Sequence, residues 1–282
     1  MPSLRDLPDR YSVILCDIWG CVHDGVSAFP SAVALLHDWR RQGRTIVLLT
    51  NAPRPSVRVR AHLAELGVDA GAYDAVVSSG DAGVDHVLTH HAGEALGFIG
   101  REDDRAVLAE AGLTRWDDER SKAVVCMGYR TETEMDPAAH DDVLAAMRAR
   151  DATLLCFNPD RIVGHGDLLV PCAGLVAERY DAMGGRTLYF GKPHRPIYDR
   201  ALAVAADRRG RSVARDEVLA VGDGPATDVK GAVDYGLDVV LVAGGIESAR
   251  VEAVGADAFL AELRTRPGLE LATPVAMVPR LE

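Results

Sequence analysis

Short apolar runs alternate with segments of helical periodicity along this chain, and that alternation restricts the fold more than any other feature. The apolar runs have the length of buried strands. Strands are predicted at 11–17, 45–50, 75–78, 95–99, 123–127, 153–157, 218–222 and 238–243, and helices at 31–42, 56–66, 141–150, 196–208 and 229–235. Alternating strands and helices predict an α/β fold with a doubly wound parallel sheet and helices on both faces. An irregular tail is expected after Pro267.

Size, charge and cysteine content narrow the class of protein. The 282 residues leave room for one large domain or two medium ones. The net charge of −11 disfavours a nucleic acid or an anionic membrane as partner. No apolar run approaches the ~20 residues of a membrane span, and the opening MPSLRDLPDRYS lacks the apolar stretch of a signal peptide. Five cysteines without paired spacing indicate reduced thiols, so we expect a cytoplasmic location.

Polar residues directly follow four of the apolar runs. They lie in the segments LCDIWGCVHDG, VLLTNAP, YFGKPH and AVGDGPATD, and they are Asp17, Thr50, Asn51, Lys192, Asp223 and Asp228. The carboxyl ends of parallel strands meet at one edge of a sheet, where α/β proteins bind their ligands. We therefore expect these residues to converge on one site.

The residue types in these segments suit phosphoryl transfer. Neighbouring carboxylates repel each other unless a hard cation lies among them, and oxygen donors favour Mg²⁺. A carboxylate beside that ion can attack phosphorus and form an aspartyl phosphate, which water then hydrolyses. A lysine and a Thr-Asn turn can donate hydrogen bonds to the phosphoryl oxygens.

Taken in this order, the four segments resemble the signature motifs of the haloacid dehalogenase (HAD) superfamily. DIWG resembles its nucleophile motif, LLTN its phosphate-binding motif, GKP its lysine motif and GDGPATD its metal motif. The stretch CFNPDRIVGHGDLLVPCAG at 156–174 resembles the large cap of class IIA members, the NagD-like sugar and nucleotide phosphatases. The resemblance implies a Rossmann-like catalytic core at 1–80 and 186–282, with an inserted α/β cap at 81–185 that sets substrate specificity.

The resemblance also implies a role for each residue of the motifs. The implied cofactor is Mg²⁺, and its protein ligands would be Asp17, the backbone carbonyl of Trp19, Asp223 and Asp228. Asp228 would bind the metal directly or orient a water on it, although its place before a helix also suits a helix cap. Asp17 would be the nucleophile. The phosphoryl oxygens would be held by Thr50, Asn51 and Lys192, with Lys192 bridging Asp17 and the phosphate.

The implied partner is a small-molecule phosphate ester, which a large cap would enclose while excluding macromolecules. The cap residues expected to contact the substrate, if they are more than plain loop residues, are Asn158, Asp160, Arg161 and His165. A homodimer formed through the cap is compatible with the resemblance. The pair His90-His91 is expected to be solvated rather than to bind metal, because adjacent residues point apart.

Trp19 departs from the family pattern at a position that matters for catalysis. The family has an aspartate there, which protonates the leaving group and then activates water. Tryptophan cannot exchange that proton, and general acid–base catalysis is typically worth about 10²–10⁴-fold. His23 and Asp24, in the loop that resembles the family's flap, are the nearest titratable candidates, although a flap histidine that simply faces solvent is also expected.

Three functions follow as alternatives. The first is a Mg²⁺-dependent phosphatase that hydrolyses a sugar phosphate or nucleotide through an aspartyl phosphate at Asp17. The second is a phosphate-binding or regulatory protein with little turnover, because Trp19 replaces the acid. Carbon–halogen cleavage is the third, and the paired acids Asp223 and Asp228 argue against it, since that reaction needs no Mg²⁺.

Overall fold

The computed structural model describes residues 4–131, 134, 136–165 and 168–282. Its contacts divide the chain into two compact units. The first unit comprises 1–50, 60–77 and 198–282, and the second comprises 51–59 and 78–197. Two helices, α2 (Ser56–Glu65) and α7 (Arg195–Arg209), run from one unit into the other. Each unit is described by itself below.

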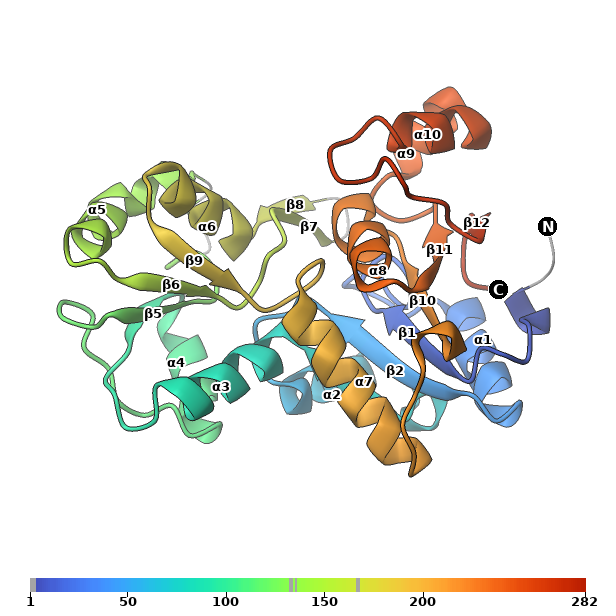
Figure 1. The fold of residues 1–282 in the computed structure, drawn as a ribbon, viewed down its shortest axis with the longest axis horizontal. Coiled ribbons are helices and arrows are strands. Elements are labelled where there is room, and N and C mark those ends of the chain that lie inside the picture. The colour runs from blue at the N-terminus through green and yellow to red at the C-terminus, as the bar shows by residue number, and fades with distance from the viewer. Residues whose placement is uncertain (1–3, 132–133, 135, 166–167) are drawn as a thin grey trace. The chain divides into compact units, whose positions relative to one another are not determined.

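A six-stranded sheet in the order β12-β11-β10-β1-β2-β3 forms the centre of the first unit (Figure 1). The strands are β1 (Val13–Asp17), β2 (Thr45–Thr50), β3 (Ala75–Ser78), β10 (Val218–Gly222), β11 (Asp238–Val242) and β12 (Ala276–Val278). Strand β1 pairs in parallel with both β2 and β10, and every residue of these three strands is buried. Continuous apolar runs of this kind belong to strands that are covered on both faces. The predicted α/β fold with a parallel sheet is confirmed.

The helices of the first unit are α1 (Pro30–Arg41), α8 (Lys230–Tyr235), α9 (Ser248–Val254) and α10 (Ala256–Leu263), with short helical turns at Leu4–Asp6, Ala70–Ala72, Arg215–Glu217 and Pro225–Val229. The tail predicted to be irregular after Pro267 contains β12, which adds to β11 at the edge of the sheet. The four apolar residues between Pro274 and Pro279 are too short a pattern to predict a strand, and only pairing with β11 makes three of them one.

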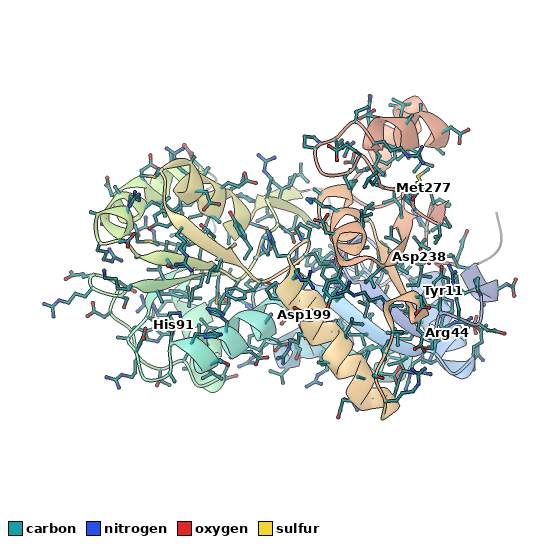
Figure 2. The ribbon with its side chains drawn as sticks, viewed as in Figure 1. Tyr11, Arg44, His91, Asp199, Asp238 and Met277 are labelled. Atoms are coloured by element: carbon teal, nitrogen blue, oxygen red, sulfur yellow. The ribbon has the colours of Figure 1, made fainter. Side chains whose placement is uncertain are left out.

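Charged residues secure the amino-terminal side of this sheet. The Tyr11 hydroxyl and the Arg10 guanidinium both donate to the carboxylate of Asp238, at 2.7 and 2.8 Å (Figure 2). The buried Arg44 side chain donates to the backbone carbonyls of Tyr11 and Leu7. The chain is thus fixed just before β1 begins.

The second unit contains a parallel sheet in the order β4-β5-β6-β9. Its strands are β4 (Gly97–Ile99), β5 (Ala123–Cys126), β6 (Thr153–Cys156) and β9 (Arg186–Tyr189). Helices α3 (Ser79–His90) and α4 (Glu102–Glu110) pack on one face, and α5 (Asp141–Ala149) and α6 (Ala173–Ala182) on the other (Figure 1). Successive residues of β5 and β6 alternate between the two apolar clusters, as side chains on a pleated strand must. A short helical turn at Pro137–His140 precedes α5.

An antiparallel hairpin follows β6 in the stretch that resembles the family's cap. It consists of β7 (Ile162–His165) and β8 (Leu168–Pro171). Leu168 and Leu169 are about two-thirds exposed, at 68 % and 66 %. No helix in the described part of the chain is both long and apolar enough to cross a membrane.

Candidate functional site

Asp17, Thr50 and Asp223 lie at the carboxyl ends of three neighbouring parallel strands. Asp17 is the last residue of β1, Thr50 is the last of β2, and Asp223 follows the last residue of β10. The strand register pairs Asp17 with Leu49 and Cys16 with Val221, so the three ends are level. All three side chains are buried. Parallel pairing therefore brings residues more than 200 positions apart in the chain to one edge of the sheet.

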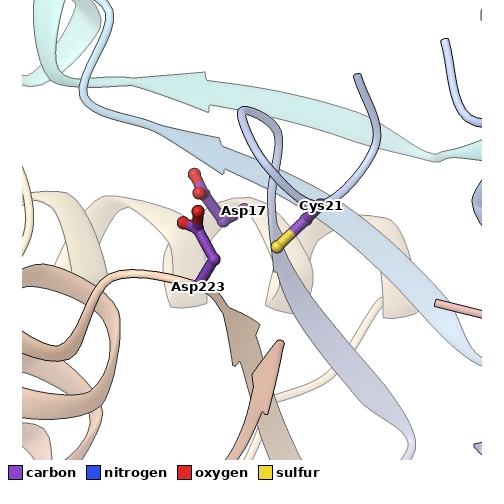
Figure 3. Close-up of side chains that lie close together, drawn as sticks. All are labelled: Asp17, Cys21 and Asp223. Carbon is purple, nitrogen blue, oxygen red and sulfur yellow. The ribbon is translucent and has the colours of Figure 1, made fainter. Parts of the chain in front are cut away.

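Two of these carboxylates and a thiol form a compact cluster. The oxygen atoms of Asp17 and Asp223 and the Cys21 sulfur all lie within 4.8 Å of one another (Figure 3). It is the one such group of three or more potential metal ligands that the described residues contain. Burial and the two carboxylates raise the pKa of the Cys21 thiol well above its usual value. The sequence analysis did not single out Cys21, although it lies four positions after Asp17 in the same motif.

Glycines enclose the carboxylate of Asp223. A Cβ atom on Gly20 would lie 2.1 Å from its Oδ2, and one on Gly245 would lie 2.0 Å from the same oxygen. The backbone N–H of Ile246 donates to that oxygen at 2.7 Å. Gly20 also has φ +74°, a conformation that favours glycine. These glycines keep the space of the carboxylate clear of side chains, and Gly245 is a neighbour of Asp223 that the sequence analysis did not identify.

The residues present suit a hard divalent cation. Two buried carboxylates at this separation repel each other strongly at low dielectric, and a cation between them removes that repulsion. Oxygen donors are the ligands that Mg²⁺ prefers. Gly20 and Gly245, called the glycine cradle below, let the backbone approach the Asp223 carboxylate without displacing it. Asp17 and Asp223 are thus the side chains that could hold Mg²⁺, and the Trp19 carbonyl remains a predicted ligand.

Asp228 fills the turn after β10. Its Oδ2 accepts hydrogen bonds from the Gly224 N–H at 3.1 Å and from the Thr227 hydroxyl at 3.2 Å. Its carboxyl carbon packs where a side chain on Gly222 would lie, 2.1 Å from the position of that Cβ. Asp228 does not belong to the cluster of Asp17, Cys21 and Asp223. Its observed contacts therefore shape the loop that carries Asp223, and its role toward a metal stays a prediction.

Asn51, the first residue of the second unit, holds the segment that carries Lys192. Its side-chain Oδ1 accepts from the Lys192 backbone N–H at 2.6 Å, and its Nδ2 donates to the Lys192 carbonyl at 3.0 Å. The same Nδ2 donates to Asp160 at 2.7 Å. Both hydrogens of the Asn51 amide are thus engaged. The Asn51 side chain positions Lys192 and Asp160, which leaves its backbone N–H as the group it could offer to a phosphate.

Lys192 was predicted to follow a buried strand, and that prediction is wrong. The preceding strand, β9, lies at the edge of the second unit's sheet; its residue Arg186 is exposed and the next three are half-buried. The Lys192 side chain itself is buried. The Lys192–Pro193 peptide bond is cis.

The four predicted cap residues differ in their surroundings. Asn158 is buried, and its Oδ1 accepts from the Asp160 N–H at 3.0 Å, which forms a tight turn before β7. Arg161 is exposed and pairs with Glu178 at 3.2 Å. His165 ends β7, and its side chain lies outside the described residues.

Comparison with known proteins identifies the family to which this chain belongs. Residues 14–114 match the family model described as haloacid dehalogenase-like hydrolase, and residues 189–265 match a second HAD-like hydrolase model. A haloacid dehalogenase-like hydrolase from Brucella suis 1330 is 38 % identical, covers 100 % of both chains and has a TM-score of 0.86. The chain belongs to the haloacid dehalogenase-like hydrolases.

Other relatives point to the NagD-like branch of the HAD-like hydrolases. The ribonucleotide monophosphatase NagD of Escherichia coli K12 is 29 % identical over 83 % of this chain and 88 % of its own length. An acid sugar phosphatase of Staphylococcus epidermidis is 24 % identical over 85 % of this chain and 89 % of its own. The 4-nitrophenylphosphatase of Thermotoga maritima, 22 % identical over 97 % of this chain and 95 % of its own, shares the fold with a TM-score of 0.73. The predicted membership in the NagD-like class IIA is confirmed.

Neither neighbour of the HAD-like nucleophile motif has the properties of a general acid at neutral pH. His23 was expected to face solvent unless it served as the acid; it is 1 % exposed, because its ring packs against Trp19 and His62. Its Nδ1 accepts from the Gly25 N–H at 2.9 Å. Burial and the nearby His62 lower the pKa of His23 to about 4, so the ring is neutral at pH 7.

Asp24 is ionised and engaged in its own loop. Its carboxylate accepts hydrogen bonds from the N–H groups of Val26 and Ser27, at 2.9 and 2.8 Å. These bonds lower the pKa of Asp24. A carboxylate stabilised in its charged form is a poor proton donor. Neither His23 nor Asp24 therefore has the properties of a proton donor that could replace the aspartate for which Trp19 stands.

The glycine cradle predicts a specific loss of metal affinity. We expect Gly20→Ala to lower Mg²⁺ affinity at least about tenfold, because the added methyl group displaces the Asp223 carboxylate. Gly43→Ala is the matched control: Gly43 has φ +82°, similar to that of Gly20, but no atom lies within 4 Å of its added Cβ. Calorimetric titration with Mg²⁺ measures both variants. Equal affinities in the two variants would contradict the prediction, because the added methyl group at Gly20 would then leave the Asp223 carboxylate in place.

The buried histidine predicts a pH-dependent stability. Because the pKa of His23 is about 4 in the folded protein and 6.5 for an ordinary histidine in the unfolded chain, the unfolded chain binds the proton more tightly, and stability falls as pH drops from 6.5 to 4. We expect His23→Gln to remove about 2–3 kcal/mol of the loss between pH 7 and pH 4.5. Urea unfolding at both pH values measures it, with His37→Gln as control. An unchanged pH dependence in His23→Gln would contradict the buried, neutral ring.

Proposed function

We propose that this HAD-like hydrolase is a Mg²⁺-dependent phosphatase of small phosphomonoesters that uses Asp17 as its nucleophile. The observation that carries the proposal is the buried pair of carboxylates, Asp17 and Asp223, at the ends of adjacent parallel strands inside a glycine cradle. The names of its relatives, a ribonucleotide monophosphatase and an acid sugar phosphatase, support a nucleotide or a sugar phosphate as the substrate class.

Asp17 performs the chemical step in this proposal. One of its carboxylate oxygens attacks phosphorus, the bond from phosphorus to the ester oxygen breaks, and the alcohol leaves with the bonding electron pair and takes up a proton. Water then attacks the aspartyl phosphate at phosphorus, which releases inorganic phosphate and restores the carboxylate. Asp17 and Asp223 would hold Mg²⁺, whose positive charge would offset the repulsion between nucleophile and phosphate.

The remaining motif residues bind and orient the phosphoryl group. The Thr50 hydroxyl, the Asn51 backbone N–H and the Lys192 ammonium are the donors in this proposal, since the Asn51 side chain is engaged with Lys192 and Asp160. Charge-assisted donors of this kind stabilise the charge that spreads over the phosphoryl oxygens in the transition state. The division into a catalytic core at 1–80 and 186–282 and a specificity cap at 81–185 stays a proposal, with Asp160 and Arg161 as the substrate-facing candidates of the cap.

The proton for the leaving group comes from solvent or from the substrate itself. Trp19 has no exchangeable acid, His23 is neutral and Asp24 is an ionised, hydrogen-bonded carboxylate. These three observations also favour a second candidate function, a phosphate-binding protein that turns over slowly. Aryl phosphates, whose leaving groups need no proton, distinguish a phosphatase from a binding protein. A phosphatase would hydrolyse them, whereas a binding protein would hydrolyse neither aryl nor alkyl phosphates at an appreciable rate.

The cytoplasmic location is part of the proposal. All five cysteines lie in the described residues, are buried and form no disulfide. Reduced, buried thiols fit a reducing compartment. A homodimer formed through the cap stays a prediction.

Replacement of the nucleophile tests the mechanism. We expect Asp17→Asn to lower kcat on 4-nitrophenyl phosphate by at least about 10³-fold, because the neutral amide cannot attack phosphorus. Circular dichroism checks that the fold is kept. Cys21→Ser is the matched control, since it changes the third member of the cluster without removing the nucleophile. Wild-type turnover in Asp17→Asn would refute covalent catalysis at this residue.

The missing acid predicts a steep dependence on the leaving group. Across a series from aryl to alkyl phosphates, kcat/KM should fall strongly as the leaving-group pKa rises. Trp19→Asp should raise activity on the alkyl esters selectively, by about 10-fold or more, because it restores a proton donor. His23→Gln and Asp24→Asn should leave the slope unchanged. A shallow slope that either of these two variants steepens would identify that residue as the acid after all.

A further inference from the structure

Three histidine rings gather at the carboxyl end of α3, within the second unit. His86 and His90 lie one helical turn apart, with ring centroids separated by 4.5 Å and planes inclined by 41°. His91, labelled in Figure 2, follows the helix, and its ring centroid lies 5.7 Å from that of His86. The adjacent residues His90 and His91 were predicted to point apart, whereas His86 and His90 are four residues apart and share a helix face.

The separation of the His86 and His90 rings suits chelation. A metal ion about 2.0–2.1 Å from an imidazole nitrogen lies about 3.2 Å from the ring centre, so two chelating rings have centroids about 4.5–5.5 Å apart. The observed 4.5 Å falls in that range. Two histidines four residues apart on a helix are also the arrangement through which the HExxH motif holds zinc.

The surroundings orient His86 and leave His90 accessible. The His86 ring packs against Phe190, with centroids 5.0 Å apart, which restricts its rotation. His90 is exposed. Partial burial and the two neighbouring histidines lower the pKa of His86, so its ring is neutral at pH 7, the form that binds metal. Side chains with restricted rotation lose less entropy when they bind.

We propose that His86 and His90 form a bidentate site for a borderline transition metal ion such as Zn²⁺ or Cu²⁺. Water would occupy the remaining coordination positions of the ion. Neutral imidazoles without a carboxylate favour these ions over Mg²⁺. The site is separate in chemistry from the Asp17–Asp223 cluster, whose donors include no histidine. It does not depend on the proposed phosphatase activity.

His91 provides a control within the same cluster. Its Nδ1 lies 2.9 Å from the Glu94 carboxylate, which holds the ring in its own contact. The described rings of His86, His90 and His91 offer no set of three ligand atoms within 4.8 Å of one another. The proposal therefore assigns the chelate to His86 and His90 alone.

The experiment is Cu²⁺ titration of the full-length, Mg²⁺-loaded protein, followed by electron paramagnetic resonance, with Zn²⁺ affinity measured by calorimetry. Nitrogen hyperfine lines report imidazole ligands, which a carboxylate–thiol site cannot produce. We expect His90→Ala and His86→Gln each to remove those lines and to lower Zn²⁺ affinity at least tenfold, with His91→Ala within threefold of wild type. His90 is exposed, so its replacement leaves the fold intact.

Two results would overturn the proposal. Nitrogen lines and Zn²⁺ affinity that persist in His90→Ala would show that the ion binds elsewhere. A loss in His91→Ala as large as that in His90→Ala would show that the chelating pair is assigned wrongly. His86→Gln keeps most of the bulk against Phe190, and thermal unfolding of each variant without metal confirms that the helix is retained.

Discussion

The repulsion between Asp17 and Asp223 is the constraint on which the rest of this site depends. Both carboxylates are buried, and parallel pairing of β10 and β1 fixes them at the same edge of the sheet. Burial removes the solvent that would otherwise screen them. The fold keeps them there through a sheet that is covered on both faces, a backbone N–H that donates to Asp223, and two glycines at positions where any side chain would displace the Asp223 carboxylate. This arrangement is the basis for the proposed cation between them.

Asn51 shows how a residue can serve a phosphate site without presenting its side chain to the phosphate. Its amide accepts from and donates to the backbone of Lys192, and it donates to Asp160 as well. One side chain thus joins a turn after β2, the lysine motif and the start of the β7–β8 hairpin. Truncating it would release three segments at once, so its loss would resemble a loss of Lys192 even though the lysine is still present.

The flap region explains why the Trp19 replacement has no local substitute. The Trp19 ring contacts His23 edge-on, and His23 is buried with a lowered pKa. The aromatic residue and the neutral imidazole form an apolar cluster where the family places a proton donor. The carboxylate of Asp24, the next residue in the chain, accepts hydrogen bonds from the N–H groups of its own turn. In the proposed mechanism this loop therefore offers no proton to the leaving group, and esters with good leaving groups are the expected substrates.

The sequence by itself determined the α/β class, the strands β1, β2 and β10, and the placement of Asp17, Thr50 and Asp223 at their ends, because uninterrupted apolar runs ending in polar residues have few other structural meanings. It could not determine Cys21 or Gly245 as parts of the site, since their relevance lies in contacts across the fold. The edge position of β9, the pairing of β12, the burial of His23 and the approach of His86 to His90 and Phe190 were likewise decided only in three dimensions. Local pattern encodes which face of a segment is buried; the particular neighbour that buries it is set by long-range packing, which no window of sequence contains.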